Sequence, residues 1–94
     1  MSQFLVLSRR RTESYVDADF DALIPAETQR VRELYAAGVV RQIWLRGDVP
    51  GAAFLVEADT EQEARGAVDA LPMATSGLSE FTVLPLSPYR GSGP

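Results

Sequence analysis

Residues 20–38 alternate between apolar and polar positions at the spacing of an amphipathic helix. Pro25 lies inside this pattern, and it either kinks the helix or opens its regular part. Gly38 is a natural C-terminal cap. The side chains expected on the buried side, called the apolar stripe below, are Phe20, Leu23, Ile24, Val31, Leu34, Tyr35 and Gly38.

A second, shorter helix is predicted from about Thr60 to about Ala70. Thr60 and Glu63 have the spacing of a capping box, in which each side chain accepts a hydrogen bond from a backbone N–H near the other. Pro72 ends this helix, because the residue before a proline disfavours helical geometry. Residues 73–78 are expected to form a loop.

Four further segments have the length and the β-branched or aromatic content of strands, at residues 4–8, 39–46, 52–58 and 79–86. The order βαββαβ predicts an α+β protein of the ferredoxin-like type, with a four-stranded antiparallel sheet and two helices on one face. We expect residues 1–86 to form one domain. Residues 87–94, rich in Pro, Gly and Ser, are expected to form a flexible C-terminal tail.

The predicted strands are apolar on both faces, although two helices cover only one. Phe4 and Val6 alternate with Leu5 and Leu7 in the first strand, and residues 52–58 follow the same pattern. The uncovered face is then an apolar patch that needs a partner. We therefore expect two sheets to pack face to face as a homodimeric α/β barrel.

One charged residue falls on the apolar stripe. Glu27 lies within roughly 20° of the centre of the stripe, at 100° per residue. An isolated carboxylate that faces a core is costly, so it needs a charged partner, a proton or a wet cavity. Two interpretations stay open: Glu27 is an acid/base residue, or it is the buried partner of an arginine.

The composition excludes several kinds of chemistry. The 94 residues carry a net charge of −4, which argues against nucleic acid as a partner. His, Cys and Lys are all absent, so Schiff bases, thiolate nucleophiles, Ser-His-Asp triads and His or Cys zinc sites drop out. Asp59, Glu61 and Glu63 are better explained by helix capping than by a metal site. No apolar run is long enough for a membrane span, and we expect a cytoplasmic protein.

Several short segments match a known pattern. They are Ala26-Glu27 with the helix up to Gly38, Arg41-Gln42-Ile43-Trp44, Leu71-Pro72, and Val83-Leu84-Pro85-Leu86. Together they resemble the muconolactone isomerase-like family of the dimeric α/β barrel superfamily, over most of the chain up to about Leu86. The resemblance implies a homo-oligomer that moves a proton within a small unsaturated lactone, without metal or cofactor. It also implies that Glu27 is the acid/base residue.

The second predicted strand departs from the family. Relatives carry Trp-Arg-His-Leu-Trp there, whereas this chain has Val40-Arg41-Gln42-Ile43-Trp44, so no imidazole is available for proton transfer. Gln42 and Trp44 alternate onto one face and would line a substrate pocket, although Trp44 also suits a dimer contact. Arg41 would hold a substrate carboxylate, or it would pair with Glu57. Arg9–Arg11 form either an anion-binding loop or a solvated strand end, and the second is favoured.

Two functions follow. In the first, the protein is a cofactor-free isomerase in which Glu27 carries the proton and Arg41, Gln42 and Trp44 position a small lactone or cyclic acid. In the second, it is a non-catalytic dimeric barrel that binds a small metabolite or serves as an accessory subunit. An open cavity beside Glu27 favours the enzyme, whereas an arginine clamped on Glu27 without a cavity favours the alternative.

Overall fold

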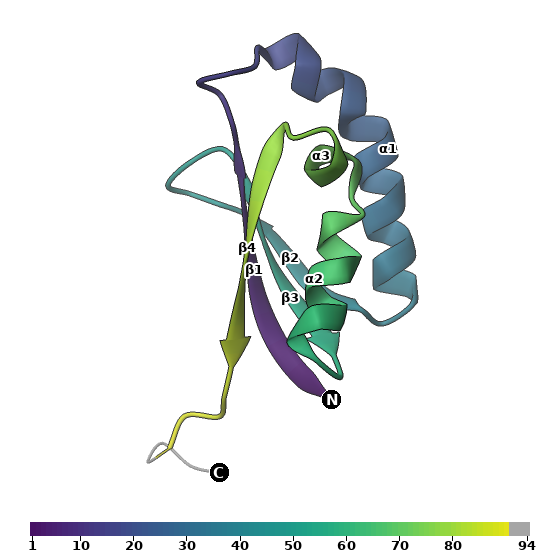
Figure 1. Cartoon of the computed structure of the whole chain (residues 1–94), viewed down its shortest axis with the longest axis vertical. Helices are drawn as coiled ribbons and strands as arrows, with labels where there is room; N and C mark the ends of the chain where they lie inside the picture. The colour runs from purple at the N-terminus through teal and green to yellow at the C-terminus, as the bar shows by residue number, and fades with distance from the viewer. Residues whose placement is uncertain (91–94) are drawn as a thin grey trace.

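The computed structural model describes residues 1–90 of the chain. Its four strands form one antiparallel sheet in the order β2-β3-β1-β4 (Figure 1). The predicted α+β class and the ferredoxin-like order of elements are confirmed. The predicted tail at residues 87–94 ends outside the described residues, because 91–94 are not among them. The elements are β1 (Ser2–Arg10), α1 (Asp17–Ala36), β2 (Val40–Leu45), β3 (Ala52–Ala58), α2 (Glu61–Asp69), α3 (Pro72–Thr75) and β4 (Ser79–Leu86).

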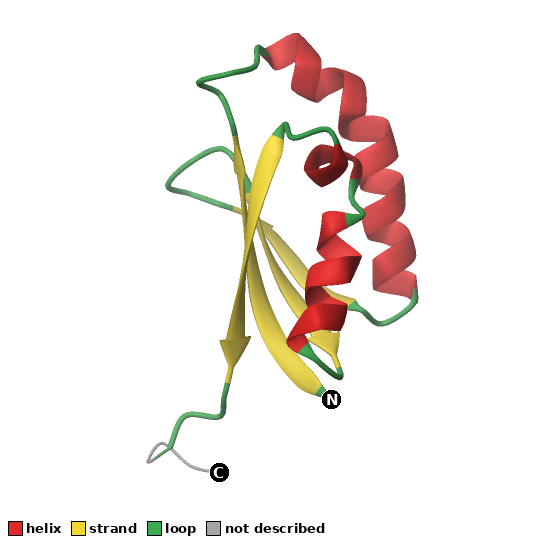
Figure 2. Ribbon diagram, viewed as in Figure 1, coloured by secondary structure: helices red, strands yellow, loops and turns green. Residues whose placement is uncertain are grey.

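All three helices lie on the same side of the sheet, and no described segment covers the other side (Figure 2). The core fills the space between the two layers. Phe4, Val6, Phe54 and Val56 point into it, as the alternation predicts, and each is at most 3% exposed. We call the side away from the helices the open face. Its apolar side chains include Leu5, Leu7, Trp44, Leu55, Leu84 and Leu86.

The helix α1 begins three residues before the predicted start. The carboxylate of Asp19 accepts a hydrogen bond from the backbone N–H of Val16 at 3.0 Å, so one free donor at the helix start is satisfied. Pro25 lies within the helix, and the first turns are inclined to the remainder in Figure 1. Gly38 follows the helix end with φ +79°, a backbone conformation that favours glycine.

The start of the second helix agrees with the prediction, whereas the segment after that helix differs from it. Thr60 caps α2 by accepting a hydrogen bond from the N–H of Glu63 at 3.1 Å, as the capping box predicts. The expected loop at residues 73–78 is partly wrong, because α3 adds a single helical turn there. Pro72 ends one helix and opens the next, since the first position of a helix needs no N–H donor.

A register shift in β2 corrects the predicted faces of that strand. Val40 pairs with Val56 and Gln42 pairs with Leu55, so Arg41 is the extra residue of a bulge. The bulge turns Val40 into the core, where it is 2% exposed, instead of onto the face of Gln42 and Trp44. Strict alternation fails because it assumes an unbroken ladder.

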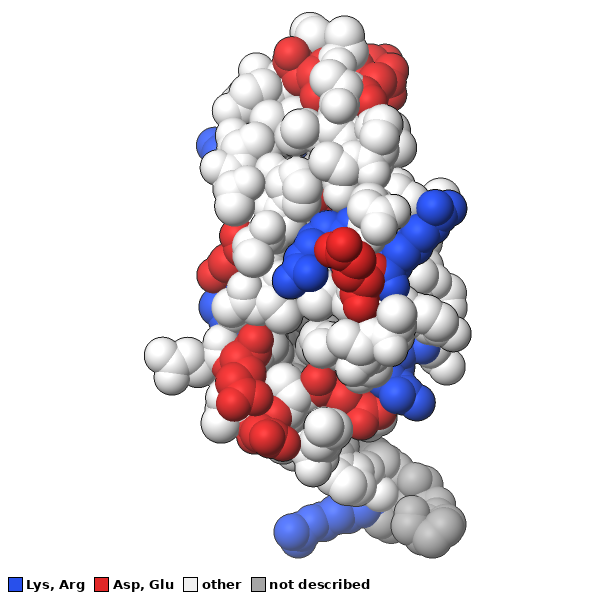
Figure 3. Space-filling model, turned by 90° about the vertical axis from the view of Figure 1, so that its right-hand side faces the viewer, with Lys and Arg blue, Asp and Glu red and all other residues white. Residues whose placement is uncertain are grey.

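The outer surface of the helix layer carries charges of both signs side by side (Figure 3). Acidic side chains gather at the end where α1 begins, and Asp17 and Asp19 lie in its first turn. They favour the helix because its N-terminus carries a partial positive charge. No helix within residues 1–90 is both long and apolar enough to cross a membrane.

Candidate functional site

The apolar stripe of α1 contacts two separate clusters of buried side chains. Towards its start, Phe20 packs with Met73 and Leu78. Towards its end, Leu34 is buried in the larger cluster on the sheet. Glu27 lies two helical turns from each of these anchors, between the clusters. The stripe is narrower than predicted, because Ile24 and Tyr35 are 39% and 63% exposed.

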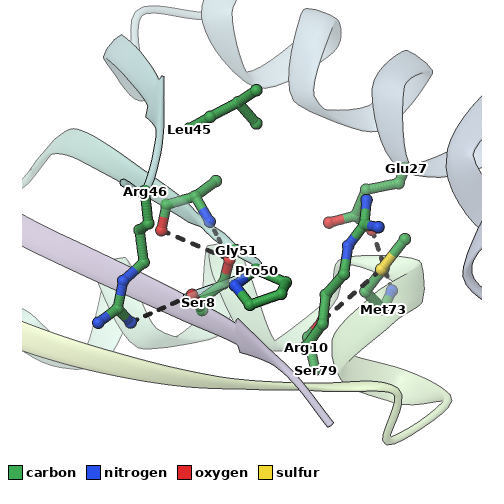
Figure 4. A pocket seen from close by; sticks show the side chains of 10 residues that line it. Ser8, Arg10, Glu27, Leu45, Arg46, Pro50, Gly51, Met73 and Ser79 are labelled. Carbon is green, nitrogen blue, oxygen red and sulfur yellow. Dashed lines mark hydrogen bonds between the residues drawn. The ribbon is translucent and has the colours of Figure 1, made fainter. Parts of the chain in front are cut away.

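A pocket of about 310 Å³ opens beneath Glu27 (Figure 4). Its volume lies within the range of small-molecule sites. Three inward positions of the strands beneath it carry small side chains, namely Ser8, Ala52 and Ser79, and Gly51 in the β2–β3 loop carries none. The space stays open because these side chains are too short to fill it. Arg10, Leu45, Arg46, Pro50 and Met73 complete its wall.

The floor of the pocket is a close contact between β1 and the end of the β2–β3 loop. The hydroxyl of Ser8 accepts a hydrogen bond from the backbone N–H of Ala52 at 2.9 Å. A Cβ on Gly51 would lie 2.0 Å from the carbonyl oxygen of Ser8, so a side chain does not fit there. The N–H of Arg10 donates to the carbonyl of Pro50 at 2.9 Å. Backbone contacts therefore fix the positions of Ser8 and Arg10.

Within residues 1–90, Glu27 makes one hydrogen bond, in which its Oε1 accepts from the backbone N–H of Met73 in α3 at 2.9 Å. Burial raises the pKa of the Glu27 carboxyl above its ordinary value, and the bond from Met73 opposes this shift in part. No arginine among the described residues forms an ion pair with Glu27. The described residues therefore do not show the arrangement that would favour a non-catalytic protein, namely a Glu27 carboxylate paired with an arginine and no cavity beside it.

Arg10 extends into the same pocket, although the sequence favoured a solvated strand end over an anion-binding loop for Arg9–Arg11. Its guanidinium carbon lies 5.3 Å from the centre of the Phe20 ring. The preceding residue, Arg9, points to the opposite face of β1. There it pairs with Glu13 at 3.0 Å and with Glu80 at 2.7 Å. The signal was present in the alternation, because Ser8 and Arg10 continue the inward positions of Phe4 and Val6.

A second hollow of about 340 Å³ lies between α1 and the strands β2 and β3. Glu27 and Ala52 line both hollows, so the two are adjacent. The remaining lining of the second hollow is largely apolar and consists of Thr28, Val31, Arg32, Ile43 and Phe54.

The structure does not bring the other predicted site residues together with Glu27. Gln42 and Trp44 pair with Leu55 and Ala53, and they lie on the open face. Neighbouring Ile43 faces the helices instead. For Arg41 the ion-pair alternative is observed, because its Nε lies 3.4 Å from the carboxylate of Glu57.

Comparison with models of known protein families gives no match, and comparison with curated proteins gives none either. Residues 1–90 contain no group of three or more His, Cys, Asp or Glu side chains that could hold a metal ion.

Proposed function

We propose that this protein is a cytoplasmic, cofactor-independent isomerase that moves a proton on a small unsaturated lactone or cyclic acid. The observation that carries the proposal is Glu27, a partly buried carboxylate without a charged partner among the described residues, at the edge of an open pocket. A general base works best when its pKa is raised towards the working pH, and burial shifts Glu27 in that direction. The muconolactone isomerase-like motifs point to the same residue.

The proposed reaction needs one proton carrier. A carboxylate oxygen of Glu27 takes a proton from a carbon next to the carbonyl or conjugated with it, and that C–H bond breaks. The electron pair spreads through the conjugated system to the carbonyl oxygen. Glu27 then returns the proton to a different carbon, so that the double bond moves and the carboxylate is restored. The hydrogen bond from Met73 holds one oxygen of Glu27 in place during both steps.

The test is proton exchange on muconolactone in heavy water, followed by NMR. Wild-type protein is expected to move the double bond and to incorporate deuterium. Glu27→Gln keeps the acceptor for the Met73 N–H but cannot take a proton, so the rate is expected to fall by about 10²- to 10⁴-fold. The matched control, Glu80→Gln, changes a surface carboxylate in the same way and is expected to leave the rate unchanged. Activity of Glu27→Gln at the wild-type rate would contradict the role of Glu27.

We further propose that the open face is covered by a second copy of the chain. Trp44 and Leu84 are 50% and 41% exposed there, next to Leu5 and Leu55 on the central strands. An apolar face of this kind is costly to leave in water. In sedimentation experiments Leu84→Asp is expected to convert dimers to monomers. Leu45→Asp, which changes an 88% exposed residue on the other side of the sheet, is expected to leave dimers intact.

A further inference from the structure

Arg10 has the properties of an anion-binding residue. Its guanidinium offers five N–H donors, and none of them forms a hydrogen bond or ion pair within residues 1–90. The ring of Phe20, which is 1% exposed, lies beneath it and restricts its movement. The side chain reaches into the pocket beside Glu27 in Figure 4.

The other arginine of this pocket is already occupied. Arg46 holds the carboxylate of Asp48 with two hydrogen bonds, at 2.9 and 2.7 Å, and also donates to the carbonyl oxygen of Ser8 at 3.4 Å. Within the described lining of the pocket, Arg10 is therefore the cation available to a ligand. A carboxylate suits it, because a guanidinium binds both oxygens of that group at once.

The adjacent hollow suits a different part of a ligand. Val31, Ile43 and Phe54 give it an apolar wall. Ile43 is 47% exposed, so the described chain leaves this wall partly uncovered. A ring or short alkyl chain placed there would remove apolar surface from water.

We propose that the two hollows form one site for a small carboxylic acid with an apolar ring or chain. Arg10 binds the carboxylate, and Val31, Ile43 and Phe54 contact the apolar part. Glu27 borders both hollows, so the carbon atoms that join the two parts of the ligand pass beside its carboxylate. The proposal rests on the proposed function only where it assigns these carbons as the place of proton transfer.

The test is calorimetric titration with 3-phenylpropanoate and with its neutral analogue 3-phenylpropanamide. Wild-type protein is expected to bind the acid more tightly than the amide. Arg10→Gln is expected to weaken binding of the acid by about tenfold or more and to leave binding of the amide unchanged. Ile43→Thr keeps a β-branched residue on the edge strand and is expected to weaken binding of the acid and of the amide to the same extent.

Two control variants identify the arginine. Arg41→Gln changes the arginine paired with Glu57, and Arg30→Gln changes the arginine paired with Glu33 on the surface of α1. Both are expected to bind the acid as wild type does. Arg10→Lys keeps the charge without the planar fork and is expected to bind the acid with intermediate affinity. This variant provides the test if Arg10→Gln does not fold.

The proposal is overturned if Arg10→Gln binds the acid as wild type does, if Arg30→Gln or Arg41→Gln loses it, or if wild type binds neither probe at millimolar concentration. Glu27→Gln separates this result from the proposed function, because it is expected to keep binding the acid while losing proton exchange. If wild type binds the acid but does not exchange protons on muconolactone, the carboxylate-binding site is supported and the isomerase function is rejected.

Discussion

The buried side of α1 is packed at both ends and open in the middle. Phe20 and Leu34 are 1% and 5% exposed, whereas Glu27, between them on the same stripe, borders two hollows. The difference comes from the facing strands, which present Phe54 and Val56 to one end but Ser8, Ala52 and Ser79 to the middle. A helix stripe alone therefore does not define a core, because the opposite layer decides whether the space is filled.

Two carboxylates show the same contrast in their electrostatics. Glu13 lies at the surface beside Arg9, whose hydrogen bond lowers the pKa of the Glu13 carboxyl to about 2. Glu27 has no such partner among the described residues, and burial raises its pKa. Glu13 is held in its charged form, whereas Glu27 is placed so that it exchanges a proton more readily near neutral pH.

The largest effect on stability is expected where the stripe is packed. Leu34→Ala removes a buried side chain from the larger cluster, so the free energy of unfolding should fall by about 2–5 kcal/mol. Ile24→Ala changes another position of the same predicted stripe, but one that is 39% exposed, and should cost about 1 kcal/mol or less. Urea denaturation measures both. Equal losses would mean that the two positions are packed alike.

A smaller effect is expected at the floor of the pocket. Gly51→Ala places a Cβ 2.0 Å from the carbonyl oxygen of Ser8, so β1 and the β2–β3 loop must move apart. We expect a loss of about 1–3 kcal/mol, measured by thermal or urea unfolding. Gly47→Ala is the matched control, because a Cβ there meets no atom within 4 Å. An unchanged stability of Gly51→Ala would refute the close contact.

The smallest effect is a difference in pH dependence. The folded chain holds the proton of Glu27 more tightly than the unfolded chain, whose pKa is near the ordinary 4.5. The contribution of Glu27 to stability is therefore complete below pH 4.5 and decreases as the pH rises through the raised pKa. Glu27→Gln does not titrate, so its stability relative to wild type should increase between about pH 4 and about pH 8.

Urea denaturation at the two pH values measures this increase. Glu13→Gln is the control, since the lowered pKa of Glu13 confines its effect to pH values below 4.5, where stability is lost as the pH falls towards about 2. A relative stability of Glu27→Gln that does not change with pH would contradict the desolvation of this carboxyl.

The sequence alone determined the order of elements, the faces of β1 and β3, and the unusual position of Glu27. These features are local, because strand alternation and helical spacing are set by backbone geometry within one segment. The Thr60 cap belongs to the same class. Its hydrogen bond from the N–H of Glu63 is observed, whereas the side chain of Glu63 accepts from the N–H of Asp59 instead of from that of Thr60. The ion pair between Arg30 and Glu33 is local in the same way, since residues three apart on a helix are neighbours.

Only the tertiary structure decided which residues surround Glu27. The bulge at Arg41 depends on pairing with β3 and reverses the face of Val40, whereas Gln42 and Trp44 end up across the sheet from the pocket. Ser8 and Arg10 reach the site from β1, and Met73 reaches it from α3. Their meeting depends on the packing of α1 and α3 against the sheet. A sequence pattern fixes the direction of a side chain within its own element, but the cavity is the space that several elements leave between them.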